Sequence, residues 1–413
     1  MDLRHHYRVA ISVPSFPSLH ATAANEDAAH PANWSGVLAM SLCVFALIAS
    51  EFMPVSLLSP IATTLGVSEG WVGYGIAISG AFAVVTSLLT ARVAGRMDRK
   101  GLLLLLTVLM CVSGVVVATA ANYAMYMLGR ALIGVVIGAF WSMSAAVAIR
   151  LVPTDEVPKA LALFNGGNAL ATVVAAPLGS YLGGIIGWRG AFFCIVPVAV
   201  VALAWQWIAL PSMRPAPQAT ARPGALRLLT RPLPALGMLA AGLFFMGQFT
   251  LFTYVRPFLE GTTGVALPAL SSILLAIGVA GLVGTLLVGH LLKGSPYPVL
   301  ILFPLVMAVI ALGLTVFGHS LPVTAVLLAA WGLVATAAPV GWWSWLAASL
   351  PHDAEAGGGL MVAVVQLCIA LGSTVGGLLY DGAGYRATFG VSALLLLLAS
   401  ATAIAVARLR RRG

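Results

Sequence analysis

Long apolar runs recur along the chain and are separated by short polar segments. An α-helix rises about 1.5 Å per residue, so roughly 20 apolar residues cross a hydrocarbon core about 30 Å thick. On this measure the sequence predicts twelve membrane-spanning helices, at residues 36–58, 71–93, 101–120, 124–149, 160–186, 191–211, 233–257, 269–292, 298–317, 322–347, 360–380 and 387–407. Several of the gaps are only a few residues long, so those neighbouring helices must be antiparallel hairpins.

The longest interior polar segment, at 212–232, separates six predicted helices from six. It carries Arg214, Arg222, Arg227 and Arg231. We expect an all-α membrane protein in which this segment is a cytoplasmic linker between an N-terminal six-helix bundle, 35–211, and a C-terminal six-helix bundle, 233–407. The polar residues 1–34 are expected to form a cytoplasmic N-terminal tail, and 408–413 a basic C-terminal tail.

Composition supports this class and argues against others. Hydrophobic residues make up 61% of the 413 residues and charged residues only 8%, too few to cover a soluble protein of this size. The mean hydropathy is +1.03. The net charge of +9 is spread over short clusters between apolar runs, so we expect no nucleic-acid partner. The four cysteines lie in four different runs without zinc-like spacing, and we expect no metal or cofactor.

Lysine and arginine are shared unevenly between the two sides of the predicted membrane. With the N-terminus placed inside, the inner loops and tails hold 17 of the 21 basic residues. Arg189 and Arg386 fall in outer loops. Cytoplasmic loops of membrane proteins carry an excess of this kind. We therefore expect both termini to be cytoplasmic.

The first inner loop, "ARVAGRMDRKGLLLLL" at 91–106, places an acid among arginines. Asp98 can pair with an arginine or lie at the N-terminus of the next helix, where the helix dipole favours a negative charge. The stretch resembles the loop pattern of the major facilitator superfamily, which implies an inner gate formed by Asp98, Arg99 and Arg96. The alternative is a solvated positively charged loop.

Glu51, in "FALIASEFMPVSLL" at 45–58, is the only one of the twelve acidic residues that lies deep in a predicted span. An ionisable side chain in the membrane is costly and marks a functional site by default. Counting from the inner helix ends places Glu51 roughly 22 Å, and Arg130 roughly 21 Å, above the inner face. The two residues are therefore expected to lie at one level.

Burial disfavours the charged form of a carboxyl group, whereas a nearby guanidinium favours it. A site that opens alternately to each side changes both effects. Glu51 and Arg130 are therefore the candidates for proton coupling, with Glu51 loading a proton outside and releasing it inside. The alternative is a static buried ion pair that holds the two helices together.

Small residues near these helices indicate close packing. In "LGRALIGVVIGAFW" at 128–141, Gly134 and Gly138 lie one turn apart and favour close helix contact. In "NALATVVAAPLGSYLGG" at 168–184, Pro177 and Gly179 predict a helix bend. Both stretches resemble helix motifs of major facilitator antiporters, and this resemblance implies a role in coupling. Ordinary small-residue packing is the alternative for both.

Aromatic and amide side chains are interleaved in "GLFFMGQFTLFTYVRPF" at 242–258, with more aromatics in "FWSMS" and "PVGWWSW". Such groups suit a flat, polar, ring-shaped ligand held by stacking and edge hydrogen bonds. The candidate substrate-binding residues are Gln248, Phe249, Tyr254, Arg256, Trp141, Asn168, Trp342 and Gln366. Many aromatics of such a chain face lipid instead. Arg256 either snorkels to the outer interface or guards the outer mouth of the cavity.

The outer corners "GGIIGWRGAF" and "GGLLYDGAGYRATF" echo each other six helices apart, as in the parallel repeats of major facilitator transporters. The stretches around helices one, four, five and seven, among them "GQFTLFTYVRPF" and "APVGWWSW", resemble the bacterial purine ribonucleoside efflux pumps. These pumps are part of the drug–proton antiporter branch of the major facilitator superfamily. The resemblance implies a monomeric, multi-pass protein of the bacterial inner membrane. It also implies export of purine nucleosides in exchange for protons.

Other functions remain open at this point. A multidrug or sugar exporter on the same fold is the nearest alternative, and a channel is a more distant one. The sequence holds no metal-binding cluster, no phosphate loop and no nucleophile elbow, so we expect no enzyme.

Overall fold

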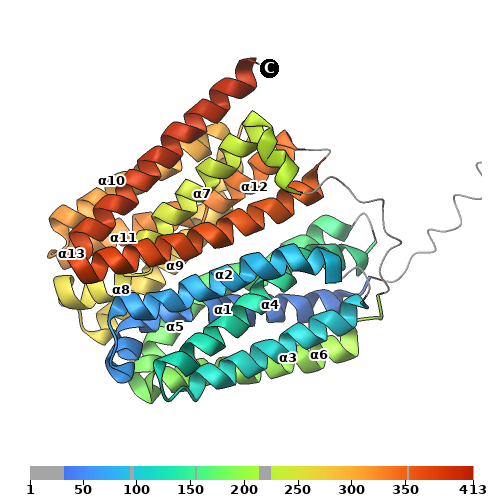
Figure 1. Cartoon of the computed structure of the whole chain (residues 1–413), viewed down its shortest axis with the longest axis horizontal. Helices are drawn as coiled ribbons and strands as arrows, with labels where there is room; N and C mark the ends of the chain where they lie inside the picture. The colour runs from blue at the N-terminus through green and yellow to red at the C-terminus, as the bar shows by residue number, and fades with distance from the viewer. Residues whose placement is uncertain (1–31, 94–96, 154–155, 214–224, 351–352, 413) are drawn as a thin grey trace, which may run out of the picture.

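The computed structural model describes residues 32–93, 97–153, 156–213, 225–350 and 353–412, and these residues contain helices and no strand. Their order is α1 (Trp34–Leu65), α2 (Glu69–Val93), α3 (Arg99–Ala118), α4 (Tyr123–Arg150), α5 (Val157–Phe193), α6 (Ile195–Ala209), η3 (Ala225–Thr230), α7 (Pro232–Phe252), α8 (Val255–Phe258), the π-helical turn η4 (Leu259–Thr263), α9 (Leu267–Leu291), α10 (Tyr297–Phe317), α11 (Leu321–Ala335), α12 (Ala338–Ser349) and α13 (Ala354–Arg412). Figure 1 shows them stacked side by side in two layers.

The described part of the chain has ten helical segments that are long and apolar enough to cross a membrane. Two of them, Lys159–Ala209 with 51 residues and Ala356–Arg411 with 56, are too long for one crossing. At about 1.5 Å per residue each exceeds twice the roughly 30 Å of a hydrocarbon core. Each turns back at one glycine, so the ten segments provide the twelve crossings that the sequence predicts.

The two turning points are Gly187, with φ 75°, and Gly384, with φ 76°. Both lie in the left-handed region that glycine adopts without steric cost, which explains why each reversal needs no longer loop. The bend at Pro177 and Gly179 stays a prediction, and the residue of α5 with non-helical torsions is Gly187. Neighbouring helices support the chain around Pro177, so the helix continues through it.

Buried hydrophobic side chains form two clusters. The first is built mainly from α1 to α6, with Tyr254 added. The second is built from η3 to α13, with Val55 and Ile76 added. We propose that these clusters are the cores of two six-helix bundles divided by the segment 212–232, and we refer to them as the first and second bundle.

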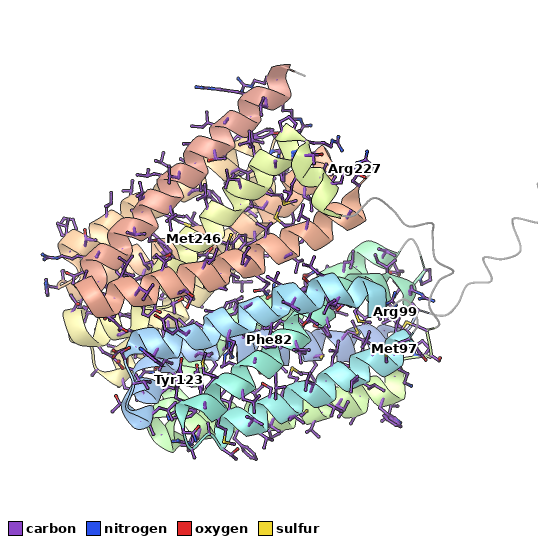
Figure 2. The ribbon with its side chains drawn as sticks, in the orientation of Figure 1. Phe82, Met97, Arg99, Tyr123, Arg227 and Met246 are labelled. Carbon is purple, nitrogen blue, oxygen red and sulfur yellow. The ribbon has the colours of Figure 1, made fainter. Side chains whose placement is uncertain are left out.

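The molecule has two ends, which we name by what they carry. The linker end holds Met97, Arg99 and Arg227, and the far end holds Tyr123 (Figure 2). The bundles meet where α2 packs on α13 and α5 packs on α9. In Figure 1 the ribbons of α2 and α13 draw apart toward the linker end.

Polar contacts join the two bundles at the far end. The Asp381 carboxylate of α13 accepts a hydrogen bond from the Ser68 hydroxyl and one of 3.1 Å from the Gly70 N–H, both at the start of α2. The Ser180 and Ser271 hydroxyl oxygens lie 3.2 Å apart and join α5 to α9. This conformation is therefore closed at the far end.

Candidate functional site

Glu51 lies near the middle of α1, and its side chain is only 4% exposed. Its carboxylate accepts a hydrogen bond of 3.3 Å from Nε2 of Gln366, which belongs to α13 of the second bundle. The other amide atom of Gln366, Oε1, is buried without a hydrogen-bond partner. A buried carboxylate thus contacts the opposite bundle through an amide that keeps one acceptor free.

Arg130 is 1% exposed and reaches α1 and α2 from α4. Nη1 donates to the Ser50 carbonyl at 2.7 Å and Nη2 to the Glu51 carbonyl at 3.1 Å. Nε donates to the Gly75 carbonyl at 3.1 Å, and Nη2 also donates to Oγ of Ser79 at 3.2 Å. The guanidinium therefore has an acceptor for each of its three nitrogens.

The static ion pair between the Glu51 carboxylate and Arg130, one of the two alternatives that the sequence left open, does not form in this conformation. Among the described residues no such pair occurs within 4.0 Å, and the carboxylate bonds to Gln366 instead. Arg130 does lie at the level of Glu51, but its guanidinium binds the main-chain carbonyl of Glu51 and forms no ion pair with the Glu51 side chain.

Pro54 explains why Arg130 binds the main chain. Proline has no N–H, so the carbonyl four residues earlier, that of Ser50, loses its usual helical donor. Arg130 donates to that carbonyl. The sequence does contain a signal for this contact, namely a proline four residues after Ser50. A search for oppositely charged partners does not detect it.

Glycines bring α4 and α2 close enough for this contact. A Cβ at Gly134 would stand 2.3 Å from the Ser79 carbonyl oxygen, and one at Gly138 would stand 2.1 Å from that of Ala83. Both positions exclude any side chain unless the backbone moves. The predicted close packing at these two glycines therefore occurs, and its partner is α2.

A ring contact beside Glu51 involves Phe249 of α7, which is buried. Its ring stacks on Phe52 of α1, with centroids 5.7 Å apart and an interplanar angle of 24°. Because Phe52 follows Glu51 directly, the stack and the hydrogen bond to Gln366 join the bundles at one level of α1. We call Glu51, Phe52, Phe249 and Gln366 the central group.

Four other candidate substrate residues lie outside the central group. Trp141 packs edge-on against Phe164 within the first bundle, and Asn168 of α5 is half-buried. Trp342 packs on Phe244 within the second bundle, and its Nε1 is buried without a partner. Gln248 of α7 is half-buried, with an unpartnered Oε1. The structure shows no hydrogen bond or ring contact between these four residues and the central group among the described residues.

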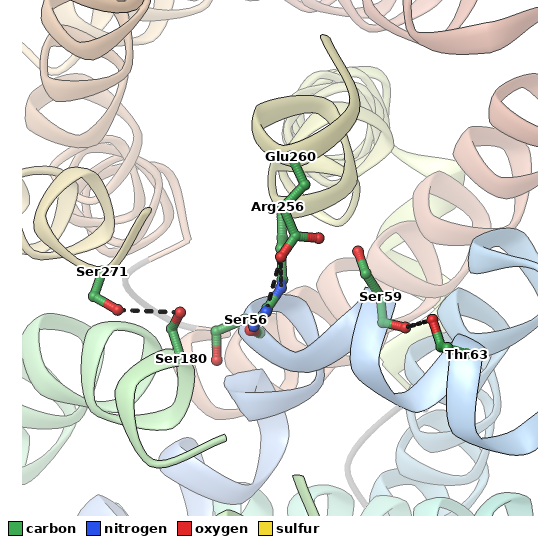
Figure 3. A network of polar contacts seen from close by, with 7 residues as sticks. All are labelled: Ser56, Ser59, Thr63, Ser180, Arg256, Glu260 and Ser271. Carbon is green, nitrogen blue, oxygen red and sulfur yellow. Dashed lines mark hydrogen bonds and ion pairs between the residues drawn. The ribbon is translucent and has the colours of Figure 1, made fainter. Parts of the chain in front are cut away.

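Tyr254 and Arg256 belong to the closed far end. The Tyr254 hydroxyl donates to the Ser373 carbonyl at 2.8 Å, and its ring stacks on Tyr380. Arg256 is 5% exposed and donates to the Ser56 carbonyl of α1 while pairing with Glu260 (Figure 3). Of the two alternatives for Arg256, this geometry favours a guard of the far end over snorkelling into the membrane interface.

Asp98 lies at the linker end as the N-cap of α3. Its carboxylate accepts hydrogen bonds from the Ser212 hydroxyl, from the Met213 N–H at 2.8 Å and from the Lys100 N–H at 3.0 Å. These bonds, that of Ser212 foremost, lower the pKa of the Asp98 carboxyl. The sequence left two roles open for Asp98, pairing with an arginine or capping the next helix. The structure shows that it caps the N-terminus of α3. Arg99 starts the same helix, and Arg96 lies outside the described residues.

No group of three or more histidine, cysteine, aspartate or glutamate side chains gathers in the described part of the chain to hold a metal ion. The four cysteines are free thiols.

Comparison with known proteins gives a consistent family. The family model of the Major Facilitator Superfamily matches residues 40–373. The chain is 62% identical over 389 residues to the protein named transcription regulatory protein OpdE of Pseudomonas aeruginosa, covering 93% of this chain and 96% of that protein. It is 40% identical over 375 residues to the purine ribonucleoside efflux pump NepI of Salmonella enteritidis, covering 91% and 94%.

Solved structures share the fold at low identity. A bacterial homologue of the human lysosomal transporter Spinster, in an inward-facing and unoccupied conformation, has a TM-score of 0.73 at 14% identity, covering 92% of this chain and 97% of that one. The human organic anion transporter MFSD10 has a TM-score of 0.67 at 19% identity, covering 91% and 100%. The twelve crossings, the family match and the near full-length relatives lead to one conclusion: this chain belongs to the Major Facilitator Superfamily, a family of multi-pass membrane transporters.

Proposed function

We propose that this transporter exports purine ribonucleosides, such as inosine and guanosine, in exchange for protons. The observation that carries the proposal is the contact between the buried Glu51 carboxylate and Gln366 of the opposite bundle. The 40% identity to a purine ribonucleoside efflux pump over nearly the whole chain supports the substrate class.

The coupling follows from the hydrogen-bonding capacity of the two side chains. A carboxylate only accepts hydrogen bonds, whereas a protonated carboxyl group also donates one. Gln366 now donates Nε2 to Glu51 and keeps Oε1 free. A protonated Glu51 donates its O–H to Oε1 of Gln366 and so occupies the acceptor that a solute would use. Loss of the proton frees this acceptor. Proton binding and solute binding therefore exclude each other through Gln366, as exchange requires.

The surroundings of Glu51 suit a purine base. Phe52 and Phe249 offer aromatic faces on which a flat heterocycle stacks. The unpartnered Oε1 atoms of Gln366 and Gln248 accept hydrogen bonds from a base N–H or a ribose hydroxyl. Trp342, with its unpartnered Nε1, and the half-buried Trp141 and Asn168 complete the proposed binding surface when the bundles move.

We place the linker end in the cytoplasm of a bacterial inner membrane, with both termini on that side. The excess of lysine and arginine in the predicted inner loops supports this orientation. On this assignment the conformation described here is closed toward the outside. Asp98 and Arg99 are then residues of an inner gate that forms when the linker end closes.

The test is uptake of radiolabelled inosine into inverted membrane vesicles that contain the full-length chain. An imposed proton gradient, acidic inside the vesicle, is expected to drive inosine accumulation. Glu51→Gln keeps the shape of the side chain and an oxygen that can accept the hydrogen bond from Nε2 of Gln366. The variant cannot bind or release a proton. We expect this variant to lose gradient-driven accumulation and to keep inosine–inosine exchange, because exchange needs no net proton movement.

Two results contradict the proposal in different ways. Inosine accumulation that does not depend on the proton gradient, or that is unchanged in Glu51→Gln, rejects proton coupling by Glu51. Normal gradient-driven export of dyes or sugars, without inosine uptake, rejects the substrate class and leaves the coupling intact.

The name of the Pseudomonas relative points to a second candidate function, an effect on gene expression, and its identity of 62% exceeds that of the pump. We propose that such an effect would be indirect, through the concentration of the exported solute in the cell. Transcript profiling of a deletion strain complemented with the wild-type chain or with Glu51→Gln separates the two. If both alleles restore the wild-type transcript profile, regulation belongs to the protein itself. If only the wild-type allele restores it, regulation depends on transport.

A further inference from the structure

A second proline of α1 repeats the pattern of Pro54. Pro60 lacks the N–H that would bond to the carbonyl four residues earlier, that of Ser56. Nη1 of Arg256 donates to that carbonyl. Each of the two prolines inside α1 thus frees a carbonyl that an arginine side chain occupies.

The two arginines differ in where they come from. Arg130 belongs to α4, and its acceptors lie on α1 and α2, so its contacts stay within the first bundle. Arg256 belongs to α8, on the second bundle, so its bond to Ser56 crosses between the bundles. The first contact is therefore preserved when the bundles move relative to each other, whereas the second must break when the far end opens.

We propose that the Ser56 carbonyl freed by Pro60 is the acceptor of a latch that holds the far end closed, with Arg256 as its donor. The latch is independent of which solute the transporter carries. It concerns the change between the closed and open far end that any transporter of this family requires.

Glu260 prepares Arg256 for this role. Its Oε1 accepts from Nε of Arg256 at 2.9 Å and lies 2.8 Å from Nη2, so the planar guanidinium is held from one side. The remaining nitrogen, Nη1, is then directed to Ser56, as Figure 3 shows. Because Glu260 lies four residues after Arg256 on the same bundle, this pair survives opening and keeps the donor oriented for reclosure.

The surroundings explain why the latch has a measurable effect. Arg256 is 5% exposed, and a buried guanidinium that loses an acceptor is destabilised. The Ser180–Ser271 contact lies at the same closed end and joins the same two bundles. Loss of the latch must therefore increase the fraction of molecules in which Ser180 and Ser271 are separated.

The experiment measures disulfide formation between Ser180→Cys and Ser271→Cys, whose hydroxyl oxygens lie 3.2 Å apart in the closed form. The full-length chain, with its four native cysteines replaced by alanine, is reconstituted in lipid nanodiscs and given a short pulse of oxidant. Pro60→Ala restores the N–H for Ser56 and leaves Arg256 in place. We expect it to lower the ratio of closed to open molecules about tenfold, the size of one charge-assisted hydrogen bond.

Pro54→Ala is the matched control, because it makes the same chemical change in the same helix but affects a contact within one bundle. We expect it to leave the disulfide rate unchanged. Arg256→Gln removes the donor and is expected to reproduce the effect of Pro60→Ala, and it decides the question if Pro60→Ala does not elute as a folded monodisperse protein. An unchanged rate in Arg256→Gln overturns the latch. An equal loss of rate in Pro54→Ala also overturns it, since the effect would then come from the shape of α1.

Discussion

Nη1 of Arg130 donates to the main-chain carbonyl of Ser50 at 2.7 Å, the carbonyl that Pro54 deprives of its helical donor. A buried cation thus repairs a break in the hydrogen bonding of α1 directly beside Glu51. The arginine that sequence reasoning assigned to the Glu51 carboxylate acts on the backbone that carries it. Arg130 therefore positions Glu51, and its contribution is coupled to Pro54.

This relationship predicts a specific non-additivity. Arg130→Gln removes several buried hydrogen bonds and is expected to lower the free energy of unfolding by about 3–5 kcal/mol. In a Pro54→Ala background the Ser50 carbonyl regains a donor, so the same substitution should cost about 1–2 kcal/mol less. The measurement is unfolding in mixed detergent micelles for the four members of the double-mutant cycle. Additive free energies would show that Arg130 and Pro54 act independently.

Gln366 should affect solute binding more than folding. Gln366→Ala removes the amide that joins Glu51 to the second bundle, and we expect KM for inosine exchange to rise about tenfold. Gln206→Ala is the control, because Gln206 is also a buried glutamine but bonds to Thr107 within the first bundle. The control should change thermal stability and leave KM unaltered. Equal KM values for the wild type and Gln366→Ala would exclude Gln366 from the binding site.

Gly138 should tolerate no side chain. A Cβ there would stand 2.1 Å from the Ala83 carbonyl oxygen, so Gly138→Ala must push α4 away from α2 and is expected to cost about 1–3 kcal/mol of stability. Gly166 of α5 has nothing within 4 Å of its Cβ position. Gly166→Ala is therefore expected to be neutral or to stabilise the helix by about 0.5–1 kcal/mol. Thermal unfolding of both purified variants tests the contrast, which a similar Tm for the two would refute.

Asp98 should make a small contribution to stability that depends on pH. Its folded-state pKa is lowered, chiefly by the Ser212 hydroxyl. The stabilisation is therefore fully present above the unfolded-state pKa, about 3.9 for aspartate, and is lost as the pH falls through the lower folded-state value. The carboxylate is well solvated, so the effect should stay below about 1 kcal/mol. Asp98→Asn should be less stable than the wild type at pH 6, and the difference should vanish near pH 2. A difference in stability that persists at low pH would be caused by the asparagine side chain and would contradict a titration effect of Asp98.

Much of the fold was readable from composition and helix length, because lipid admits few alternatives. A segment that crosses the hydrocarbon core must satisfy its backbone internally, so apolar runs of sufficient length have to be helices. The turn between the fifth and sixth crossings was predicted within a few residues, since Gly187 lies between the expected spans. The glycine contacts of α4 were also foreseeable, although their partner, α2, was not named by the sequence.

The candidate site was only partly readable. The lone acid Glu51 is visible in the sequence because a carboxylate among apolar residues is costly and marks a functional site by default. Its contact with Gln366 was not, because the two residues lie 315 positions apart and no local pattern links them. Depth arithmetic placed Arg130 at the right level but could not tell which oxygen of α1 would face its guanidinium. That depends on helix rotation, which tertiary packing sets.

The sequence by itself determined the class of molecule, the number of crossings and the acidic residue that lies within a crossing, since each follows from the cost of polar groups in lipid. The tertiary structure alone decided the partners: Arg130 on the Ser50 carbonyl, Arg256 on that of Ser56, and Gln366 on Glu51. The physical reason is that helix spacing and rotation arise from packing contacts spread over many residues. A shift of a few ångströms in that packing changes which acceptor a long side chain reaches.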